Sequence, residues 1–143
     1  MTTHQQLALK AVIGIMRTHG KLIKSLKSYV ADKGINMTEF SVLELLQHRG
    51  KQPIQQIAER ILVGSSSIAY VISQLEKKAL IEREIDPEDR RVCYIHLSGS
   101  GRALMEEVFP PHAQRIDQIF GAVDEAALTQ LLATLRQLDF ELE

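Results

Sequence analysis

Two short segments that alternate in polarity constrain the fold of this chain more than any other feature. Residues 81–85 (IEREI) and 92–97 (VCYIHL) alternate between apolar and polar or charged side chains, and 86–91 (DPEDRR) between them has turn chemistry. A period of two is typical of β-strands, and the second segment is rich in residues that favour strands. The three segments together predict a β-hairpin with a charged tip.

The chain before this hairpin has the three-to-four-residue spacing of apolar side chains that indicates amphipathic helices. A first helix is expected over residues 5–31, stopped by Gly34 in a left-handed conformation. A second helix should run from Thr38, as its N-cap, to His48. Pro53 is expected as the first residue of a short third helix, Ile54–Arg60.

Three further helices are predicted. A fourth, Ser65–Lys78, follows a serine-rich break and buries its apolar face. Ser98 can cap a fifth, in which Pro110-Pro111 predicts a kink or a break because proline removes a backbone hydrogen bond. A last helix should begin near Asp124.

The order of these elements is that of a winged helix-turn-helix, so the predicted fold class is mainly α with a small β-wing of two or three strands. In such a fold the N-terminal half of the second helix of the motif faces the major groove of DNA. The side chains available there form hydrogen bonds: Ser65, Ser66, Ser67, Tyr70, Ser73 and Gln74, with Lys77 near the helix end. Three serines at a helix start, taken alone, are more often only a cap.

The predicted hairpin concentrates charge near its tip. Arg90 and Arg91 lie in the turn and Arg83 lies on the preceding strand. An arginine can therefore reach the minor groove next to the predicted major-groove helix, Ser65–Lys78, which we call the reading helix. Asp86 or Asp89 can orient one arginine through a charge-assisted pair. An exposed loop of mixed charge with no partner explains the same residues equally well at this point.

The distribution of charge matters more than its total. The 143 residues carry a formal net charge of -1, but residues 1–33 hold six Lys/Arg against one Asp, and residues 103–143 hold two Arg against eight acids. The ends of one chain can therefore attract those of a second chain. A first helix of about 40 Å is too long to bury its apolar stripe on one small lobe, which also favours a homodimer.

Several classes of protein are disfavoured. No apolar run is long enough to span a bilayer and no signal peptide is visible, so we expect no membrane partner and a cytoplasmic location. The single cysteine, Cys93, fits a reducing compartment; a half-buried structural thiol is favoured over a redox role. The five histidines lack metal-ligand spacing. No catalytic motif is present, so we expect no catalytic residues, no cofactor, no metal and no enzymatic activity.

The run 75–83 (LEKKALIER), followed by 86–91 (DPEDRR) and 95–98 (IHLS), resembles the MarR (multiple antibiotic resistance regulator) family over nearly the whole chain. The resemblance implies one structural domain in which residues 1–34 and 99–143 form a helical dimerisation region and 35–98 form the winged helix-turn-helix. It implies a homodimer on double-stranded DNA with a pseudo-palindromic operator, acting as a repressor released by small aromatic compounds or oxidants. The alternative is a winged-helix module that binds proteins, since the reading helix is poor in Arg and Lys before Lys77.

The resemblance also assigns roles to residues. Asp89 and Arg91 match the pair that braces the wing, and Arg90 matches the wing tip. A ligand crevice between the first, second and fifth helices is expected, with Met16, His19 and Phe40 as guesses for its lining. The chain departs from the family in having Ala79 where relatives often have Gly, and Tyr70 where many have Arg.

Overall fold

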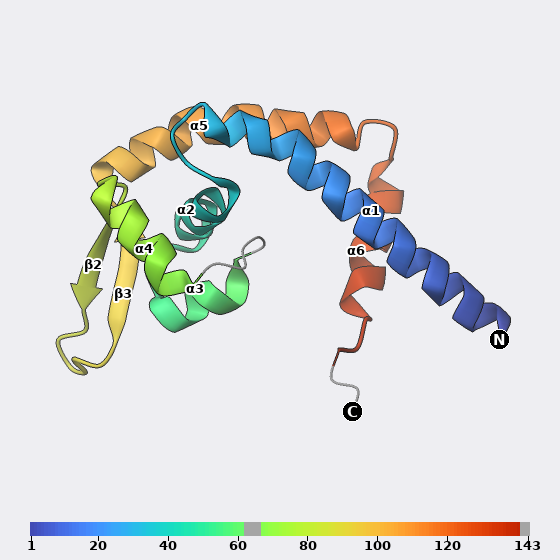
Figure 1. Cartoon of the computed structure of the whole chain (residues 1–143), viewed down its shortest axis with the longest axis horizontal. Coiled ribbons are helices and arrows are strands. Elements are labelled where there is room, and N and C mark those ends of the chain that lie inside the picture. The colour runs from blue at the N-terminus through green and yellow to red at the C-terminus, as the bar shows by residue number, and fades with distance from the viewer. Residues whose placement is uncertain (62–66, 141–143) are drawn as a thin grey trace. The chain divides into compact units, whose positions relative to one another are not determined.

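The computed structural model describes residues 1–61 and 67–140, and the chain divides into two units, Met1–Phe109 and Pro110–Glu143. The chain is mainly α-helical with one small antiparallel sheet, which confirms the predicted fold class (Figure 1). The elements in chain order are α1 (Thr3–Ala31), α2 (Met37–Arg49), β1 (Gln52–Pro53), α3 (Ile54–Arg60), α4 (Ile68–Lys77), β2 (Ile81–Ile85), β3 (Cys93–Leu97), α5 (Gly99–Ile119) and α6 (Glu125–Arg136).

The turn between α1 and α2 is set by two local signals. Gly34 has φ of 76°, the left-handed value predicted for it, and this conformation costs glycine little. The N-cap of α2 is Asn36 and not Thr38, so the predicted start was wrong by two residues. The Asn36 side chain accepts a hydrogen bond from the backbone N–H of Glu39 at 2.8 Å, and the Glu39 carboxylate accepts one from the backbone N–H of Asn36 at 3.1 Å. This reciprocal capping box explains why the helix begins earlier.

The core of the first unit surrounds α2. Phe40, Val42 and Leu43 on this helix are at most 2% exposed, because α1, α3, α4 and the sheet pack against it. The side chains of this core come from every one of these elements, which makes the lobe a single packing unit. The largest fully buried members are Phe40, Leu43, Ile57, Ile72, Leu75, Ile95 and Met105.

The sheet has the strand order β1-β3-β2, with both pairs antiparallel. In the hairpin, Ile81 pairs with Leu97 and Ile85 with Cys93, so the two alternating segments are in register across the predicted turn. Only Ile81 of β2 is buried, whereas Ile85 is 60% exposed, because the hairpin extends beyond the lobe into solvent (Figure 1).

The third strand was left open by the sequence. Pro53 pairs with Tyr94 and is the N-cap of α3 with ψ of 145°, so it precedes the helix and is not its first residue. The extended backbone before α3 therefore serves the sheet as well as the helix start.

Two expectations for the C-terminal half had different outcomes. α5 continues from Gly99 to Ile119 through both Pro110 and Pro111, so of the predicted kink or break, the break is excluded. A proline in a helix loses one backbone donor but keeps a helical φ, and the flanking turns hold the helix together. Asp124 caps α6 as predicted, accepting a hydrogen bond from the backbone of Ala127 at 2.8 Å.

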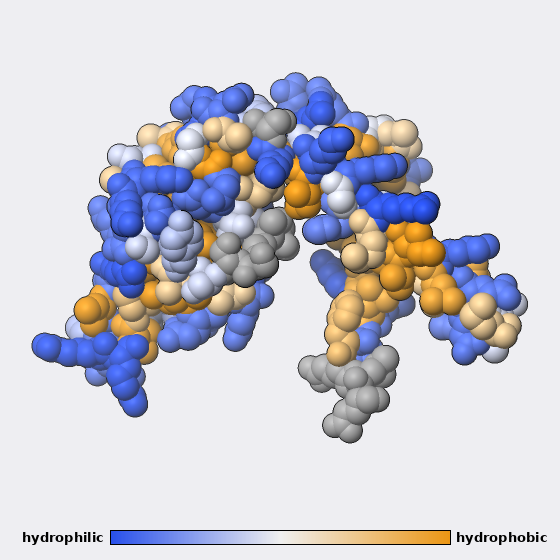
Figure 2. Space-filling model, in the orientation of Figure 1, coloured by the Kyte–Doolittle hydropathy of each residue, from blue (hydrophilic) through white to orange (hydrophobic). Residues whose placement is uncertain are grey.

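Two helices carry apolar side chains that are exposed in the single chain. On α1 these are Leu7, Leu9, Val12, Ile13, Ile15 and Met16, which are 44–66% exposed. Figure 2 shows apolar side chains gathered along the N-terminal half of this helix. On α6, Leu131, Leu132, Leu135 and the following Leu138 are 40–53% exposed. None of the helices in the described part of the chain is both long enough and apolar enough to cross a membrane.

Candidate nucleic-acid interface

The helix α4 has one face in the core and one face in solvent. Val71, Ile72 and Leu75 are buried, and this apolar side fixes the rotation of the helix on the lobe. The opposite side carries Tyr70, which is 62% exposed, and the exposed Lys77. Ser73 and Gln74 are half-buried between the two faces. The solvent face therefore consists of groups that can donate and accept hydrogen bonds.

The start of α4 differs from the prediction. The helix begins at Ile68 with Ser67 at the N-cap, not at Ser65. Within the described residues, the Ser67 hydroxyl makes no capping hydrogen bond to α4. Ser65 and Ser66, which were also predicted to face DNA, lie outside the described residues.

The turn of the wing is closed by Asp86. Its Oδ1 accepts hydrogen bonds from the backbone of Glu88 at 2.8 Å and Asp89 at 3.4 Å, and its Oδ2 accepts one from the Tyr94 hydroxyl at 3.3 Å. Aspartate in this role mimics a backbone turn. The backbone N–H of Asp86 also donates to the Val92 carbonyl at 3.0 Å. Asp86 therefore shapes the turn and does not orient an arginine.

Asp89 and Arg91 form the ion pair that the sequence predicted. Arg91 donates from Nε to Asp89 Oδ1 at 3.0 Å and from its NH2 group to Oδ2 at 3.2 Å. The hydrogen bonds from Arg91 lower the pKa of the Asp89 carboxyl, and the same pair raises the pKa of Arg91. Arg90, between them, is exposed and has no hydrogen bond or ion pair within the described residues. At the wing tip, the guanidinium of Arg91 is therefore held by Asp89, whereas that of Arg90 can bind another molecule.

Arg83 connects the wing to the reading helix. Its Nε donates to Glu76 Oε1 at 2.6 Å, and this hydrogen bond is the main reason that the pKa of Arg83 is raised. Sequence reasoning named Arg83 but missed Glu76. The signal was an opposite charge seven residues earlier, across a tight helix-to-strand junction. Cys93 is half-buried on β3, as predicted.

The junction between α4, β2 and α5 depends on close backbone contacts. Ala79 has φ of 59°, in the left-handed region that favours the glycine relatives often have at this position. The Ser98 hydroxyl donates to the Ala79 carbonyl at 2.6 Å and accepts from the backbone of Gly101 at 3.0 Å, which confirms Ser98 as a cap of α5. A Cβ at Gly101 would lie 2.0 Å from the Leu80 carbonyl oxygen. No local pattern in the sequence indicates that Gly101 is required here.

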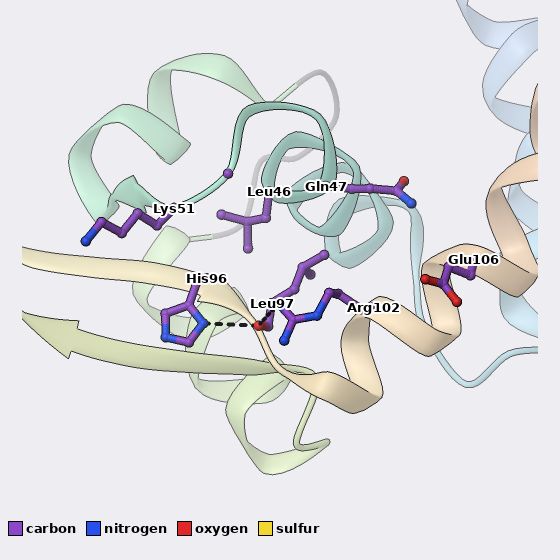
Figure 3. Close-up of a pocket in the computed structure, with 8 residues that line it drawn as sticks. Leu46, Gln47, Lys51, His96, Leu97, Arg102 and Glu106 are labelled. Carbon is purple, nitrogen blue, oxygen red and sulfur yellow. Dashed lines mark hydrogen bonds between the residues drawn. The ribbon is translucent and has the colours of Figure 1, made fainter.

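A cavity of about 350 Å³ opens beside this junction, on the side of α2 and β1. Figure 3 shows His96 and Arg102 on either side of Leu97, whose carbonyl oxygen lies 3.0 Å from His96 Nδ1 and 3.4 Å from an Arg102 nitrogen. The predicted ligand residues Met16, His19 and Phe40 do not line this cavity. Met16 and His19 are exposed on α1, and Phe40 is buried in the core.

Within residues 1–61 and 67–140, no three His, Cys, Asp or Glu side chains come together in a way that could hold a metal ion. The polar groups that the structure does bring together are those of α4 and the wing, and their chemistry suits hydrogen bonding and charge pairing with a polyanion.

Comparison with known proteins agrees with this geometry. The model of the MarR family matches residues 35–93, which run from the α1–α2 turn to the first residue of β3. The chain is 37% identical to the HTH-type transcriptional regulator MhqR of Bacillus subtilis over 131 residues, covering 92% of this chain and 90% of that protein. It is 29% identical to the transcriptional repressor MprA of Escherichia coli over 125 residues, covering 86% and 71% respectively.

A solved structure extends the match to the fold. Bordetella bronchiseptica BpsR, whose DNA binding is regulated by 6-hydroxynicotinic acid, superposes with a TM-score of 0.76 at 23% identity, covering 90% of this chain and 97% of that chain. The exposed polar face of α4, the arginine-bearing wing and these matches lead to one conclusion: the chain belongs to the MarR family of winged helix-turn-helix, DNA-binding transcription regulators.

Proposed function

We propose that this protein is a homodimeric repressor that binds a pseudo-palindromic operator in the cytoplasm and is released by a small aromatic effector. It acts by binding and not by catalysis. The proposal rests on two features of one lobe. The outward face of α4 is polar, and the wing-tip residue Arg90 is exposed and has no partner among the described residues.

The DNA contacts that we propose are of two kinds: contacts to base edges, which distinguish sequences, and contacts to phosphates, which position the protein on the duplex. Tyr70, Ser73 and Gln74 can reach base edges in the major groove. Ser67 and the first amides of α4, with Lys77, can bind phosphates. The proposed set also includes Ser65, Ser66, Arg83, Arg90 and Arg91.

Arg83 and Arg91 are paired with carboxylates in this structure, at Glu76 and Asp89 respectively. Both retain further N–H donors, because a guanidinium has five and each pair uses at most two. Their roles in DNA binding are therefore secondary to orienting the wing, whereas Arg90 is the group that we expect to enter the minor groove.

The proposed homodimer follows from the exposed apolar side chains of α1. Residues 7–16 (LALKAVIGIM) include one charged side chain, so the helix is apolar on nearly every side. A helix of this kind is normally buried. A second copy of the chain is the partner that we propose, with residues 1–34 and 99–143 as the dimerisation region and 35–98 as the DNA-binding region. The two reading helices can then address two half-sites.

The effector proposal rests on relatives. The DNA binding of BpsR is regulated by 6-hydroxynicotinic acid, and we extend that kind of regulation to this chain as a hypothesis. Met16, His19 and Phe40 remain the proposed lining. An effector can release the operator only if it binds a dimer with wrongly spaced reading helices more tightly than it binds the dimer that fits the operator.

The experiment that tests the function is selection of bound duplexes from a random pool by the purified full chain. The proposed function predicts an enriched inverted repeat and binding that weakens steeply as salt rises, because phosphate contacts release counterions. The selected complex is then challenged with phenols, quinones and peroxides to find an effector. Failure to enrich any duplex at low salt would favour a winged-helix module that binds proteins.

A further inference from the structure

Lys78, the residue directly after α4, uses all of its hydrogen-bond donors inside the protein. Its Nζ donates to Glu39 Oε1 at 2.9 Å, to Glu39 Oε2 at 2.8 Å and to the Gly34 carbonyl at 2.9 Å. An ammonium group has three N–H donors. Although its side chain is 36% exposed, Lys78 therefore has no donor left for a DNA phosphate.

Glu39, the partner of Lys78, is 3% exposed and has a second role. Its Oε1 also accepts a hydrogen bond from the backbone of Asn36 at 3.1 Å, so the same carboxylate caps α2 and pairs with the end of α4. A buried carboxylate is costly without a partner. We call the set Lys78, Glu39 and the Gly34 carbonyl the Lys78 clasp.

The clasp lies at the turn where α1 ends. The same turn is held to α5 by an ion pair between Lys33 and Glu107 and by a hydrogen bond from the Tyr29 hydroxyl to the Val108 carbonyl at 2.9 Å. The end of the reading helix is thus tied directly to the end of the proposed dimerisation helix, within the first unit. The angle between these two helices sets how far apart the reading helices of a dimer lie.

We propose that Lys78 is a positioning residue for DNA binding: the Lys78 clasp fixes the orientation of α4 relative to α1 and so sets the half-site spacing that the dimer accepts. This inference rests on the proposed function. The preceding residue, Lys77, is exposed and has no hydrogen bond or ion pair within the described residues, so it is the matched control for a phosphate contact.

The test compares Lys78→Met with Lys77→Met on the duplex selected by the wild type and on duplexes with the half-sites moved by one base pair. Lys77→Met should lower the salt dependence of binding by about one counterion per protomer and leave the spacing preference intact. Lys78→Met should weaken binding to the best duplex by roughly tenfold, leave the salt dependence unchanged and flatten the spacing preference. A reduced salt dependence for Lys78→Met, or an unaltered affinity and spacing preference, would overturn the proposal.

A second variant keeps the test valid if Lys78→Met folds poorly. Glu39→Gln with Lys78→Met removes both charges, so no unpaired carboxylate is buried, and the glutamine oxygen can still cap α2. This double variant should unfold cooperatively and show the same flattened spacing preference. A double variant that folds and keeps the wild-type preference contradicts the proposed role.

The clasp is also tested without DNA. A double-mutant cycle on the free energy of unfolding should show coupling between Glu39→Gln and Lys78→Met and none between Glu39→Gln and Lys77→Met.

The failure of the proposed function and the failure of this inference give different results. A wild type that selects no duplex contradicts the proposed function, and with it the role of Lys78 in DNA binding, even if the coupling is present. A wild type that binds DNA but shows no coupling contradicts the inference alone.

Discussion

At the scale of single residues, two neighbouring arginines at the wing tip differ in what they are free to do. Arg91 is held by Asp89 in a two-point ion pair, whereas Arg90 has no partner among the described residues. An exposed ion pair of this kind adds little to global stability but restricts the backbone between its members. The Asp89–Arg91 pair therefore fixes the backbone at Arg90 and keeps the Arg90 side chain in solvent.

This difference gives a prediction for Arg90→Ala. We expect operator binding to weaken by about 1–3 kcal/mol, because the wing loses its groove contact. The melting temperature should not change, since the side chain is exposed and unpaired. Fluorescence anisotropy titration measures the affinity, and Arg90→Lys is the control that keeps the charge. An unchanged affinity would show that the wing tip does not reach DNA.

Ala79 is a second residue with a measurable consequence. Its φ of 59° places a Cβ in the left-handed region, which costs an alanine about 1 kcal/mol. Ala79→Gly should therefore raise the free energy of unfolding by at most about 0.5 kcal/mol, because the extra chain entropy of glycine (roughly 0.5–1 kcal/mol) offsets most of the relieved strain. Urea denaturation measures this change. Ala103→Gly, at an exposed position inside α5, is the control and should lower the free energy of unfolding by about 1 kcal/mol. Equal changes in the free energy of unfolding at both sites would contradict the argument.

At the scale of elements, the wing is held in one shape by carboxylates. Asp86 closes the turn and Asp89 pairs with Arg91, while Glu76 ties β2 to α4 through Arg83. Among them, the Asp89 carboxylate accepts the hydrogen bonds of Arg91 as an anion, which is why the pKa of this carboxyl is lowered.

The pH dependence of the wing follows from Asp89. Because Arg91 lowers the pKa of this carboxyl below its ordinary value of about 3.9, the pair is fully formed above that value and is lost only as pH falls through the lower, folded-state pKa. Wing order should therefore be constant from about pH 5 to 8. Titration of the Asp89 carboxyl by NMR should show its pKa rise toward the ordinary value in Arg91→Ala. A titration curve identical in wild type and variant would contradict the role of the pair.

At the scale of the whole molecule, the first unit exposes apolar side chains that it does not itself cover. Val12, Ile13 and Met16 of α1 are 58%, 51% and 66% exposed, with the spacing of one helix face. Exposed patches of this extent mark interaction sites. A reading helix that must address two half-sites also needs a second copy.

The dimer gives the prediction for this scale. Ile13→Glu should convert a dimer into a monomer and weaken operator binding by at least tenfold, because a carboxylate cannot be buried unpaired in an apolar interface (roughly several kcal/mol). Sedimentation velocity measures the oligomeric state. Ile13→Leu, which keeps the apolar volume, should remain dimeric. A wild type that sediments as a monomer at micromolar concentration would contradict the proposed assembly.

The sequence by itself determined the order and type of the elements and the residues of the wing. The hairpin, Gly34, Ser98, Asp124 and the Asp89–Arg91 pair were predictable because each depends on neighbours within a few residues. The local signal failed at Asn36, where a better cap lies two residues earlier, and at Pro110-Pro111 it allowed a break that the continuous helix excludes.

Only the tertiary structure decided the contacts between distant segments. The sequence alone could not pair Lys78 with Glu39, 39 residues earlier, or place Pro53 beside Tyr94. It also could not show that Gly101 packs against the Leu80 carbonyl. The physical reason is that such contacts depend on how the helices pack around α2, and many side chains contribute to that packing at once. Local periodicity specifies each helix, whereas its direction relative to the next helix is set by the shared core.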